Sequence, residues 1–424
     1  MDFPKILIIS NNCFSLSTNN GRTLGNFFSG WDKEKIAQFY IKPEIPQKDI
    51  CANYLCVSDE TVLNIFKRKK SIKGIQNALE QSGDSNGQSI KRNSFTMIAR
   101  YWLWSLTSWE KKSGFYKFVD DFAPDAVLLQ AGDTPHMYDL TRKIAKKRNI
   151  PIIMYNSEDY VFRTQDYFEK SSFFAKLAYP IFRKMLRTSF VKILKQTTHV
   201  IYISDKLQRT YNKIYKHQSS VIYTSTAATP SESLTSNDPL VVSYFGNLHL
   251  DRYISLIELA NAFREVDPRI KVDVYGEIPT NEIKNALEEC KAIRTHGFVP
   301  YDVVRRVMAE SDILLHAESF AEYYQSINAN YFTTKIADCL ASGKAFLVYA
   351  PSHIAFMEYL RDHDAAILID SPKDLKKTVE KVVASEEFRN SRVEKARLLA
   401  AQNHDFGRNR ETFQRIIKEN SRKV

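Results

Sequence analysis

The sequence has 424 residues, of which 44% are hydrophobic, with 13 glycines and 14 prolines. Its length exceeds that of one typical core and predicts two or three domains of about 100 to 200 residues each. The composition excludes a disordered or fibrous chain. Residues 1–200 carry 30 lysines and arginines against 19 acidic residues, so the whole formal net charge of +11 lies in the first half. This excess favours an anionic partner for that half, such as a membrane surface, a phosphorylated lipid or a nucleic acid.

The sequence has no run of about 18 apolar residues, so it predicts no membrane-spanning helix. The first apolar stretch, residues 6–9, is too short for the core of a signal peptide, and we expect the protein to start at Met1 in the cytoplasm. Five cysteines are scattered without paired spacing, which predicts neither a disulfide framework nor a zinc site. We therefore expect no metal site and no cofactor.

The first half of the chain has the pattern of a parallel α/β domain, with strands predicted over 5–10, 37–42, 54–58, 126–131, 152–155, 199–204 and 220–225. A helix is predicted to begin near Asn20 or Gly21, just after the first strand. There Gly21 permits close backbone approach, and Arg22 and Thr23 offer a charge and a hydroxyl to an anionic ligand. A P-loop is excluded because Leu16 stands where that motif needs a glycine. The alternative is an ordinary loop and helix cap.

Polar side chains follow two of the predicted strands. Asp133 and His136 come after the strand over 126–131, and Glu158 and Asp159 come after the strand over 152–155. Ligands of open α/β sheets gather at such strand ends, so these four side chains are candidates for contact with a substrate. For His136, a structural role is the competing interpretation.

Two aromatic and basic segments suggest a surface that contacts a membrane. Residues 97–119 contain three of the four tryptophans, and residues 173–195 form a predicted amphipathic helix with few acids. Its expected apolar stripe consists of Phe174, Leu177, Ile181, Met185 and Phe190. Interfacial helices on an anionic leaflet fit this pattern, and core helices with snorkelling lysines are the alternative. Nucleic-acid binding is not favoured, because no helix-turn-helix, RNP or zinc-finger signature occurs.

Residues 226–239, rich in Ser, Thr and Pro, are the predicted linker. Beyond it, strands predicted over 240–245, 271–275, 292–295, 312–316, 345–349 and 366–369 alternate with helical periodicity, which indicates a Rossmann-like parallel sheet. Residues 388–424 are helical and basic, without a strand.

The stretch over residues 312–350 carries the most specific motif. A strand, a polar loop, a helix from Thr333 or Thr334, a stop at Gly343 and a second strand are predicted there. Lys335 at the helix start favours an anion such as a phosphate. Asp338, three residues later on the same face, suits the hydroxyls of a ribose. A sugar nucleotide fits both, and an ordinary cap, a solvated charge and a first-turn acid are the alternative.

This segment resembles the donor site of group-one, retaining glycosyltransferases of the GT-B fold, whose helix has the form acid-x-(Leu/Met)-Ala-x-Gly. Here that motif is Asp338-Cys339-Leu340-Ala341-Ser342-Gly343. One position departs from the pattern, because Asn330 stands where the family has a glutamate. The resemblance implies two Rossmann-like domains facing a cleft: an acceptor- and membrane-facing domain over 1–225 and a donor domain over 240–387. It also implies that residues 388–424 cross back to the first domain.

The resemblance also implies roles for individual residues. Arg252 and Lys335 would clamp the donor diphosphate without a metal, Asp338 would bind the ribose, and Glu318 would contact the sugar hydroxyls. His136 or Asp133 would reach the sugar from the first domain. Further donor contacts are expected from Gly246, Asn247, Gly297, Phe298, Thr333 and Thr334. Asp362-His363-Asp364 spells a metal motif of another glycosyltransferase fold, but it lies between a predicted helix and strand and is interpreted as a solvated loop.

The expected reaction is transfer of a sugar from a nucleoside diphosphate donor, with UDP favoured, to a hydroxyl of a lipid-linked saccharide. The resemblance places this reaction at the anionic inner face of a bacterial membrane, in capsule or exopolysaccharide synthesis. A UDP-sugar epimerase of the same fold is one alternative. A non-catalytic saccharide- or membrane-binding partner is another, and Asn330 favours it.

Overall fold

The computed structural model describes residues 3–15, 19–67, 92–164, 166, 168, 173–226 and 236–422. The chain divides into two compact units, of which the first comprises Met1–Ile222 with Gly407–Val424 and the second comprises Tyr223–Phe406. Residues 227–235 of the predicted linker lie outside the described residues. Among the described helices, none combines the length and the apolarity needed to cross a bilayer.

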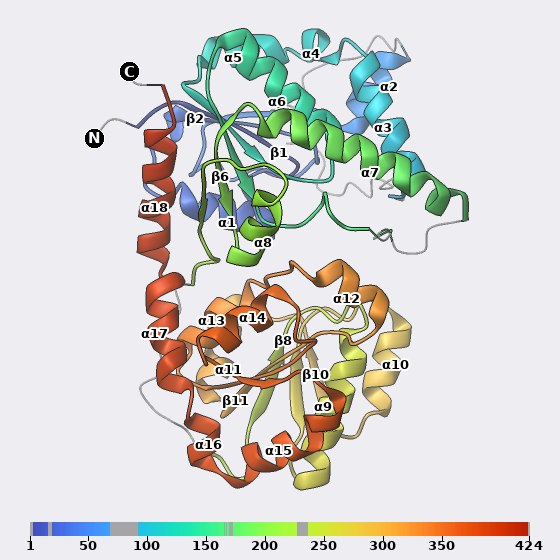
Figure 1. Cartoon of the computed structure of the whole chain (residues 1–424), viewed down its shortest axis with the longest axis vertical. Helices are drawn as coiled ribbons and strands as arrows, with labels where there is room; N and C mark the ends of the chain where they lie inside the picture. The colour runs from blue at the N-terminus through green and yellow to red at the C-terminus, as the bar shows by residue number, and fades with distance from the viewer. Residues whose placement is uncertain are drawn as a thin grey trace. The chain divides into compact units, whose positions relative to one another are not determined.

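The first unit contains a seven-stranded parallel sheet in the order β3-β2-β1-β4-β5-β6-β7, with helices on both faces (Figure 1). Its strands are β1 (Ile6–Ser10), β2 (Ile36–Tyr40), β3 (Asn53–Cys56), β4 (Ala126–Gln130), β5 (Ile152–Asn156), β6 (Thr197–Tyr202) and β7 (Ser219–Val221). Every residue of β1, β2, β4 and β5 is buried, as expected for parallel strands covered on both faces. All seven predicted strands are present, with ends that differ by a few residues.

The helices of the first unit are α1 (Asn19–Phe27), α2 (Asp59–Phe66), α3 (Ser94–Leu106), α4 (Trp109–Lys112), α5 (Phe115–Phe122), α6 (Pro135–Arg148), α7 (Phe173–Leu194), α8 (Asp205–Asn212) and α18 (Phe406–Glu419). The last of these belongs to the first unit from Gly407 onward. In α18, Phe413 stacks on Phe27 with ring centroids 4.6 Å apart, and Gln414 donates to the carbonyls of Phe27 and Ser29. The end of the chain therefore completes the core of the first unit.

The tryptophan-rich segment forms three helices, α3, α4 and α5. An Asn93–Thr96 capping box starts α3, and Gly114 precedes α5 in a left-handed conformation with φ of 76°. Trp104 and Trp109 are buried, so the core interpretation holds for them, whereas Trp102 is 51% exposed.

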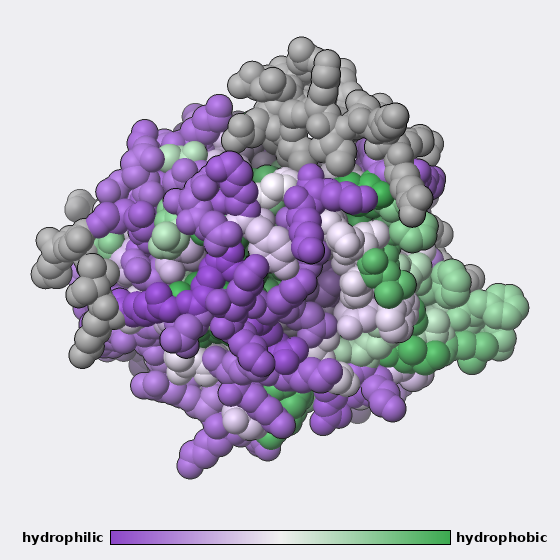
Figure 2. Space-filling view, turned by 90° about the horizontal axis from the view of Figure 1, so that it is seen from above, coloured by the Kyte–Doolittle hydropathy of each residue, from purple (hydrophilic) through white to green (hydrophobic). Residues whose placement is uncertain are grey.

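Helix α7 divides the apolar stripe that the sequence predicted. Phe174, Leu177 and Ile181 of that stripe are between 58% and 78% exposed, Met185 is half-buried and Phe190 is buried. The buried face of the helix runs along its whole length and includes Ala175, Tyr179, Phe182 and Leu186. Asp139 of α6 accepts hydrogen bonds from Tyr101 of α3 and Ser189 of α7, which fastens these three helices together. Hydrophobic residues gather at one edge of the face in Figure 2, on the side where α7 begins in Figure 1.

The second unit contains a six-stranded parallel sheet in the order β10-β9-β8-β11-β12-β13. Its strands are β8 (Val242–Phe245), β9 (Val272–Tyr275), β10 (Ile293–Gly297), β11 (Ile313–Ala317), β12 (Ala345–Tyr349) and β13 (Ile367–Ile369). Its helices are α9 (Arg252–Val266), α10 (Asn281–Glu289), α11 (Tyr301–Glu310), α12 (Glu322–Asn328), α13 (Lys335–Ala341), α14 (Ala355–Asp362), α15 (Leu375–Ala384), α16 (Glu386–Asn390) and α17 (Val393–Asn403). All six predicted strands are present, and α12 lies where a loop was expected.

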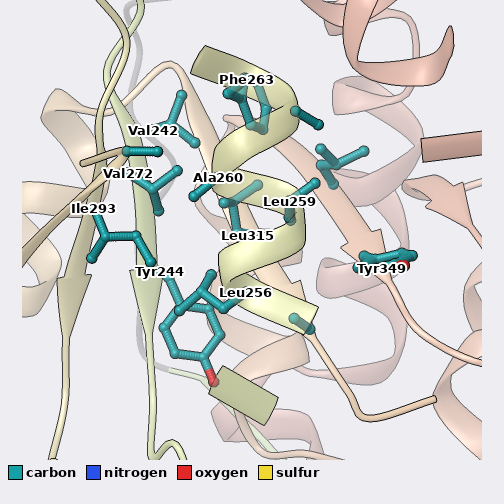
Figure 3. Packing of buried hydrophobic residues seen from close by; sticks show 14 of the residues in the cluster. Val242, Tyr244, Leu256, Leu259, Ala260, Phe263, Val272, Ile293, Leu315 and Tyr349 are labelled. Atoms are coloured by element: carbon teal, nitrogen blue, oxygen red, sulfur yellow. The ribbon is translucent and has the colours of Figure 1, made fainter. Parts of the chain in front are cut away.

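The core of the second unit is built around α9. Leu256, Leu259 and Phe263 recur at helical spacing and pack with Val242 and Leu315 of the sheet (Figure 3). This packing fixes the first residue of α9, Arg252, beside the end of β8.

Candidate functional site

In each sheet the order of the strands reverses at one point, and that point is where a ligand is expected to bind. In the second unit the order reverses between β8 and β11, and in the first unit it reverses between β1 and β4. Open α/β sheets bind ligands at the carboxyl ends of the strands that flank such a reversal. In the second unit this position is lined by Gly246 and Asn247 after β8, by Arg252 at the start of α9, and by Glu318 after β11.

Arg252 and Glu318 form a buried ion pair at this position. Arg252 Nε donates to Glu318 Oε2 over 2.8 Å, and the side chains are only 4% and 0% exposed. Arg252 Nη1 donates to Asn247 Oδ1 over 2.6 Å, and the guanidinium lies 5.4 Å from the ring centre of Tyr331. Burial alone would raise the pKa of Glu318, but Arg252 and then His316 outweigh it and hold that pKa below its usual value. The carboxylate is therefore charged and orients the guanidinium.

The fully buried position of Glu318 differs from the expected contact with sugar hydroxyls. One of its oxygens accepts from Arg252, and the other lies 3.2 Å from His316 Nε2. Burial lowers the pKa of His316, so the imidazole is neutral at pH 7. We therefore assign Glu318 to holding Arg252 in place.

Lys335 brings a second cation to the same place from α13. A Cβ added to Gly246 would overlap Lys335 Nζ, so the ammonium lies against the backbone of the turn after β8. Only glycine leaves room for it there. Burial lowers the pKa of Lys335 to about 8, and the positive charge of Arg252 acts in the same direction. The predicted helix begins at Lys335 itself; Thr333 is buried just before it, and Thr334 is exposed.

Asp338 lies in the first turn of α13, one turn beyond Lys335. Its Oδ1 accepts hydrogen bonds from the Thr226 hydroxyl over 2.6 Å and from the Tyr301 hydroxyl over 3.0 Å. Phe298, which follows β10 and Gly297, is 82% exposed. Asn330, the departure from the family motif, is half-buried between α12 and α13.

The candidates of the first unit follow β1, β4 and β5. A Cβ on Gly132 would come within 2.7 Å of Asn11 Nδ2, so these two residues lie against each other where the strand order reverses between β1 and β4. Beside them the Asp133 carboxylate forms an ion pair with Arg92. Gly21, Arg22 and Thr23 lie in α1.

His136 and Asp159 have internal partners. The ring of His136 is buried and stacks on Trp104 with centroids 4.5 Å apart, and burial holds its pKa well below the usual value. The ring of His136 therefore packs against α3 within the first unit. Asp159 Oδ1 accepts from the Tyr211 hydroxyl over 3.0 Å.

Glu158 is a partly exposed carboxyl, with 38% of its side chain accessible to solvent. Its nearest ionic partner is Arg163, at 3.7 Å, and burial raises its pKa despite that positive charge. Glu158 and Asp133 each follow the carboxyl end of a strand of the first sheet.

Sequence reasoning did not identify His316, Thr226, Tyr301 or Asn11. The position of His316, two residues before Glu318 at the end of a buried strand, could have indicated that it lies beside this carboxylate. Thr226 and Tyr301 are far from Asp338 in the sequence, so no local pattern could connect them. Within the described ranges, no cluster of His, Cys, Asp and Glu side chains could hold a metal ion.

Comparison with known proteins supports a shared architecture. HepE from Anabaena, solved in complex with UDP and glucose, matches with a TM-score of 0.62 and 11% identity over 98% of this chain and 100% of that chain. Sucrose-phosphate synthase from Thermosynechococcus elongatus matches with a TM-score of 0.66 and 10% identity over 98% of both chains. WaaG, a glycosyltransferase involved in lipopolysaccharide biosynthesis, matches with a TM-score of 0.56 and 12% identity over 97% of this chain and 99% of that chain. The chain has the GT-B fold.

A sequence match adds to the structural likeness in one part of this GT-B chain. Residues 256–415 match the family described as "Glycosyl transferase-like". This stretch contains Glu318, Lys335 and Asp338. No curated protein matches the sequence. At 10–12% identity the solved structures establish the fold, and the ligands named with them belong to those proteins.

Proposed function

We propose that the protein is a glycosyltransferase that moves a sugar from a nucleoside diphosphate donor to an acceptor hydroxyl. The observation that carries this proposal is the meeting of Lys335 Nζ and the Arg252–Glu318 pair at the strand reversal of the second unit. Arg252 and Lys335 bring two positive charges there, and Glu318 brings one negative charge. A diphosphate would satisfy the remaining positive charge.

The proposed chemistry needs this arrangement. When the bond between sugar and diphosphate breaks, negative charge develops on the leaving diphosphate, and preorganised cations stabilise it most effectively. Glu318 holds the guanidinium ready, so no reorganisation is needed at that moment. Burial, and then the positive charge of Arg252, lower the pKa of Lys335, so its ammonium would gain from a nearby anion. These two side chains can neutralise the leaving group without a metal ion.

The rest of the donor fits around this centre. Asp338, one turn along α13, would accept hydrogen bonds from the ribose, and the exposed ring of Phe298 could stack on the base. UDP is the favoured nucleotide, because HepE, which has the same fold, was solved with it. Retention of configuration is expected from the resemblance to group-one enzymes.

The acceptor is proposed to be a lipid-linked saccharide of cell-surface polysaccharide synthesis, met at the anionic inner face of the membrane. The exposed surface of α3 and α7 supports this. Its apolar members are Phe95, Trp102, Leu106, Phe173, Phe174, Leu177 and Ile181. Exposed Lys176, Lys184 and Arg187 lie on α7 among these residues. We name this set the α3–α7 surface. Large apolar side chains beside cations suit an anionic bilayer, and each near-surface charge contributes about 1 kcal/mol.

A thermal-shift screen against UDP, GDP, ADP, CMP and their common sugar conjugates, with and without EDTA, tests the donor proposal. Ligands that bind only the native state raise the apparent melting temperature. A shift with one nucleoside diphosphate that survives EDTA supports the donor site and identifies the base. No shift with any of them would contradict it and would favour a non-catalytic partner. Release of an epimerised sugar without acceptor would instead favour the epimerase.

A further inference from the structure

Asp338 is held by two hydroxyl groups from distant parts of the sequence. Thr226 lies before the second sheet, Tyr301 begins α11, and both donate to Oδ1 of Asp338. All three residues belong to the second unit. Burial, and then the charge of Asp338, raise the pKa of the Tyr301 phenol, so it stays protonated and remains a donor at neutral pH.

We propose that Thr226 and Tyr301 are positioning residues that present the Asp338 carboxylate to the ribose of the nucleotide. This inference rests on the proposed function and adds to it the source of selectivity for ribose over a sugar without the diol. A carboxylate accepts up to about four hydrogen bonds, so it can bind ribose hydroxyls while protein donors hold it. Fixing the carboxylate in advance removes the entropy cost of ordering it when the nucleotide binds.

The backbone around Thr226 is itself fixed, which allows its hydroxyl to act as an anchor. The Thr226 amide donates to the His404 carbonyl over 2.9 Å, and Thr226 forms a parallel bridge with Asp405. His404 is fully buried, with Nδ1 placed 2.7 Å from the Thr224 carbonyl. A carbonyl only accepts, so Nδ1 carries the proton and Nε2 accepts from the Tyr359 hydroxyl over 3.0 Å.

The protonation state of His404 keeps this arrangement intact at neutral pH. Burial lowers its pKa to about 4, so the ring is neutral and both hydrogen bonds persist at pH 7. The segment that carries Thr226 is therefore tied to α14 and α17 before any nucleotide arrives.

Isothermal titration calorimetry with UDP and 2′,3′-dideoxy-UDP tests the inference. The two probes differ only in the diol, so the ratio of their dissociation constants measures how much the ribose hydroxyls contribute to binding. We expect wild-type protein to favour UDP by about tenfold or more, as charge-assisted hydrogen bonds allow. Thr226→Val and Tyr301→Phe should each shrink this ratio several-fold while the affinity for dideoxy-UDP is unchanged.

Three further variants separate positioning from a general effect on the fold. Asp338→Asn should abolish the preference, Thr226→Ser should restore it, and Thr378→Val in α15 should leave both affinities as in wild type. Unchanged ratios in Thr226→Val and Tyr301→Phe would overturn the inference, as would an equal loss of affinity for both probes. Failure of the proposed function looks different, because wild-type protein would then bind neither probe.

Discussion

Arg252 Nε donates to Glu318 Oε2 over 2.8 Å, and neither side chain has more than 4% of its surface exposed. Removing one partner of a buried ion pair leaves the other charge uncompensated. Glu318→Ala should therefore lower the free energy of unfolding by about 3–5 kcal/mol. Urea denaturation followed by circular dichroism measures this. Asp370→Ala breaks the half-exposed pair with Arg361 in the same unit, and it should cost less than about 1 kcal/mol. Equal small losses in both variants would show that the Glu318 carboxylate does not hold Arg252.

Binding of UDP should weaken above pH 8 because of Lys335. Its pKa is lowered to about 8, so below that pH the ammonium is already charged when the diphosphate arrives. Above pH 8 binding must take up a proton, and the dissociation constant should rise by up to about tenfold per pH unit. Calorimetry between pH 7.5 and 9.5 measures the effect. Lys335→Arg is the matched control, because a guanidinium stays charged over this range. The same slope in wild type and in Lys335→Arg would assign the titration to another group.

Gly246 and Gly276 should respond differently to a methyl group. At Gly246 the added Cβ meets the tip of the flexible Lys335 side chain, so Gly246→Ala should weaken nucleotide binding by displacing the ammonium. The φ of 154° at Gly246 is one that side chains rarely adopt, so the same variant should also lose some stability through backbone strain. At Gly276 the added Cβ meets the Gly246 carbonyl, which belongs to the backbone, so Gly276→Ala should destabilise the second unit by about 1–3 kcal/mol. Melting temperature and UDP affinity, measured on both variants, separate the two effects. Normal UDP affinity in a folded Gly246→Ala protein would contradict the position given to Lys335.

The α3–α7 surface should bind anionic vesicles through both its apolar and its basic side chains. Phe174→Ser with Leu177→Ser should reduce co-sedimentation with vesicles of phosphatidylglycerol and phosphatidylcholine at any salt concentration, because apolar burial is lost. Lys184→Gln with Arg187→Gln should reduce it mainly at low salt, because screening already weakens these charges at high salt.

Controls for the vesicle experiment come from the second unit. Ile254→Ser and Lys373→Gln change an exposed apolar and an exposed basic residue there, and both should leave binding unchanged. Wild-type binding by both α3–α7 double variants would remove the membrane assignment. Self-association of wild-type protein that Phe174→Ser abolishes would instead assign the surface to a second copy of the chain.

The architecture was largely predictable because parallel strands are short, continuous apolar runs. All thirteen predicted strands are present, and their alternation with helices indicated two Rossmann-like sheets. Short helices with polar sequences were not predictable in this way. Helix α12 has too few apolar positions to show a period, and the division of α3 from α5 depends on caps and on Gly114.

Local sequence patterns indicated only those site residues that are close in sequence, and the pairing of Arg252 with Lys335 came from the resemblance to group-one enzymes. Lys335 and Asp338 share one turn of helix, and the motif alone brought them together. The resemblance implied that Glu318 contacts the sugar. Its pairing with Arg252, 66 residues away, is a tertiary contact that no local pattern could indicate. The stripe on α7 shows the same limit, since periodicity marks an apolar face but cannot tell whether another element covers it.

The most direct test of the donor site is calorimetric titration of UDP into wild-type protein, Lys335→Ala and Lys291→Ala, each with EDTA. Lys291 is an exposed lysine of the same unit, so its loss controls for a general change in charge. We expect Lys335→Ala to weaken binding by about 1.5–3 kcal/mol, as loss of a charge-assisted contact does, and Lys291→Ala to bind like wild type. Equal affinity of all three proteins for UDP would contradict the proposed diphosphate site.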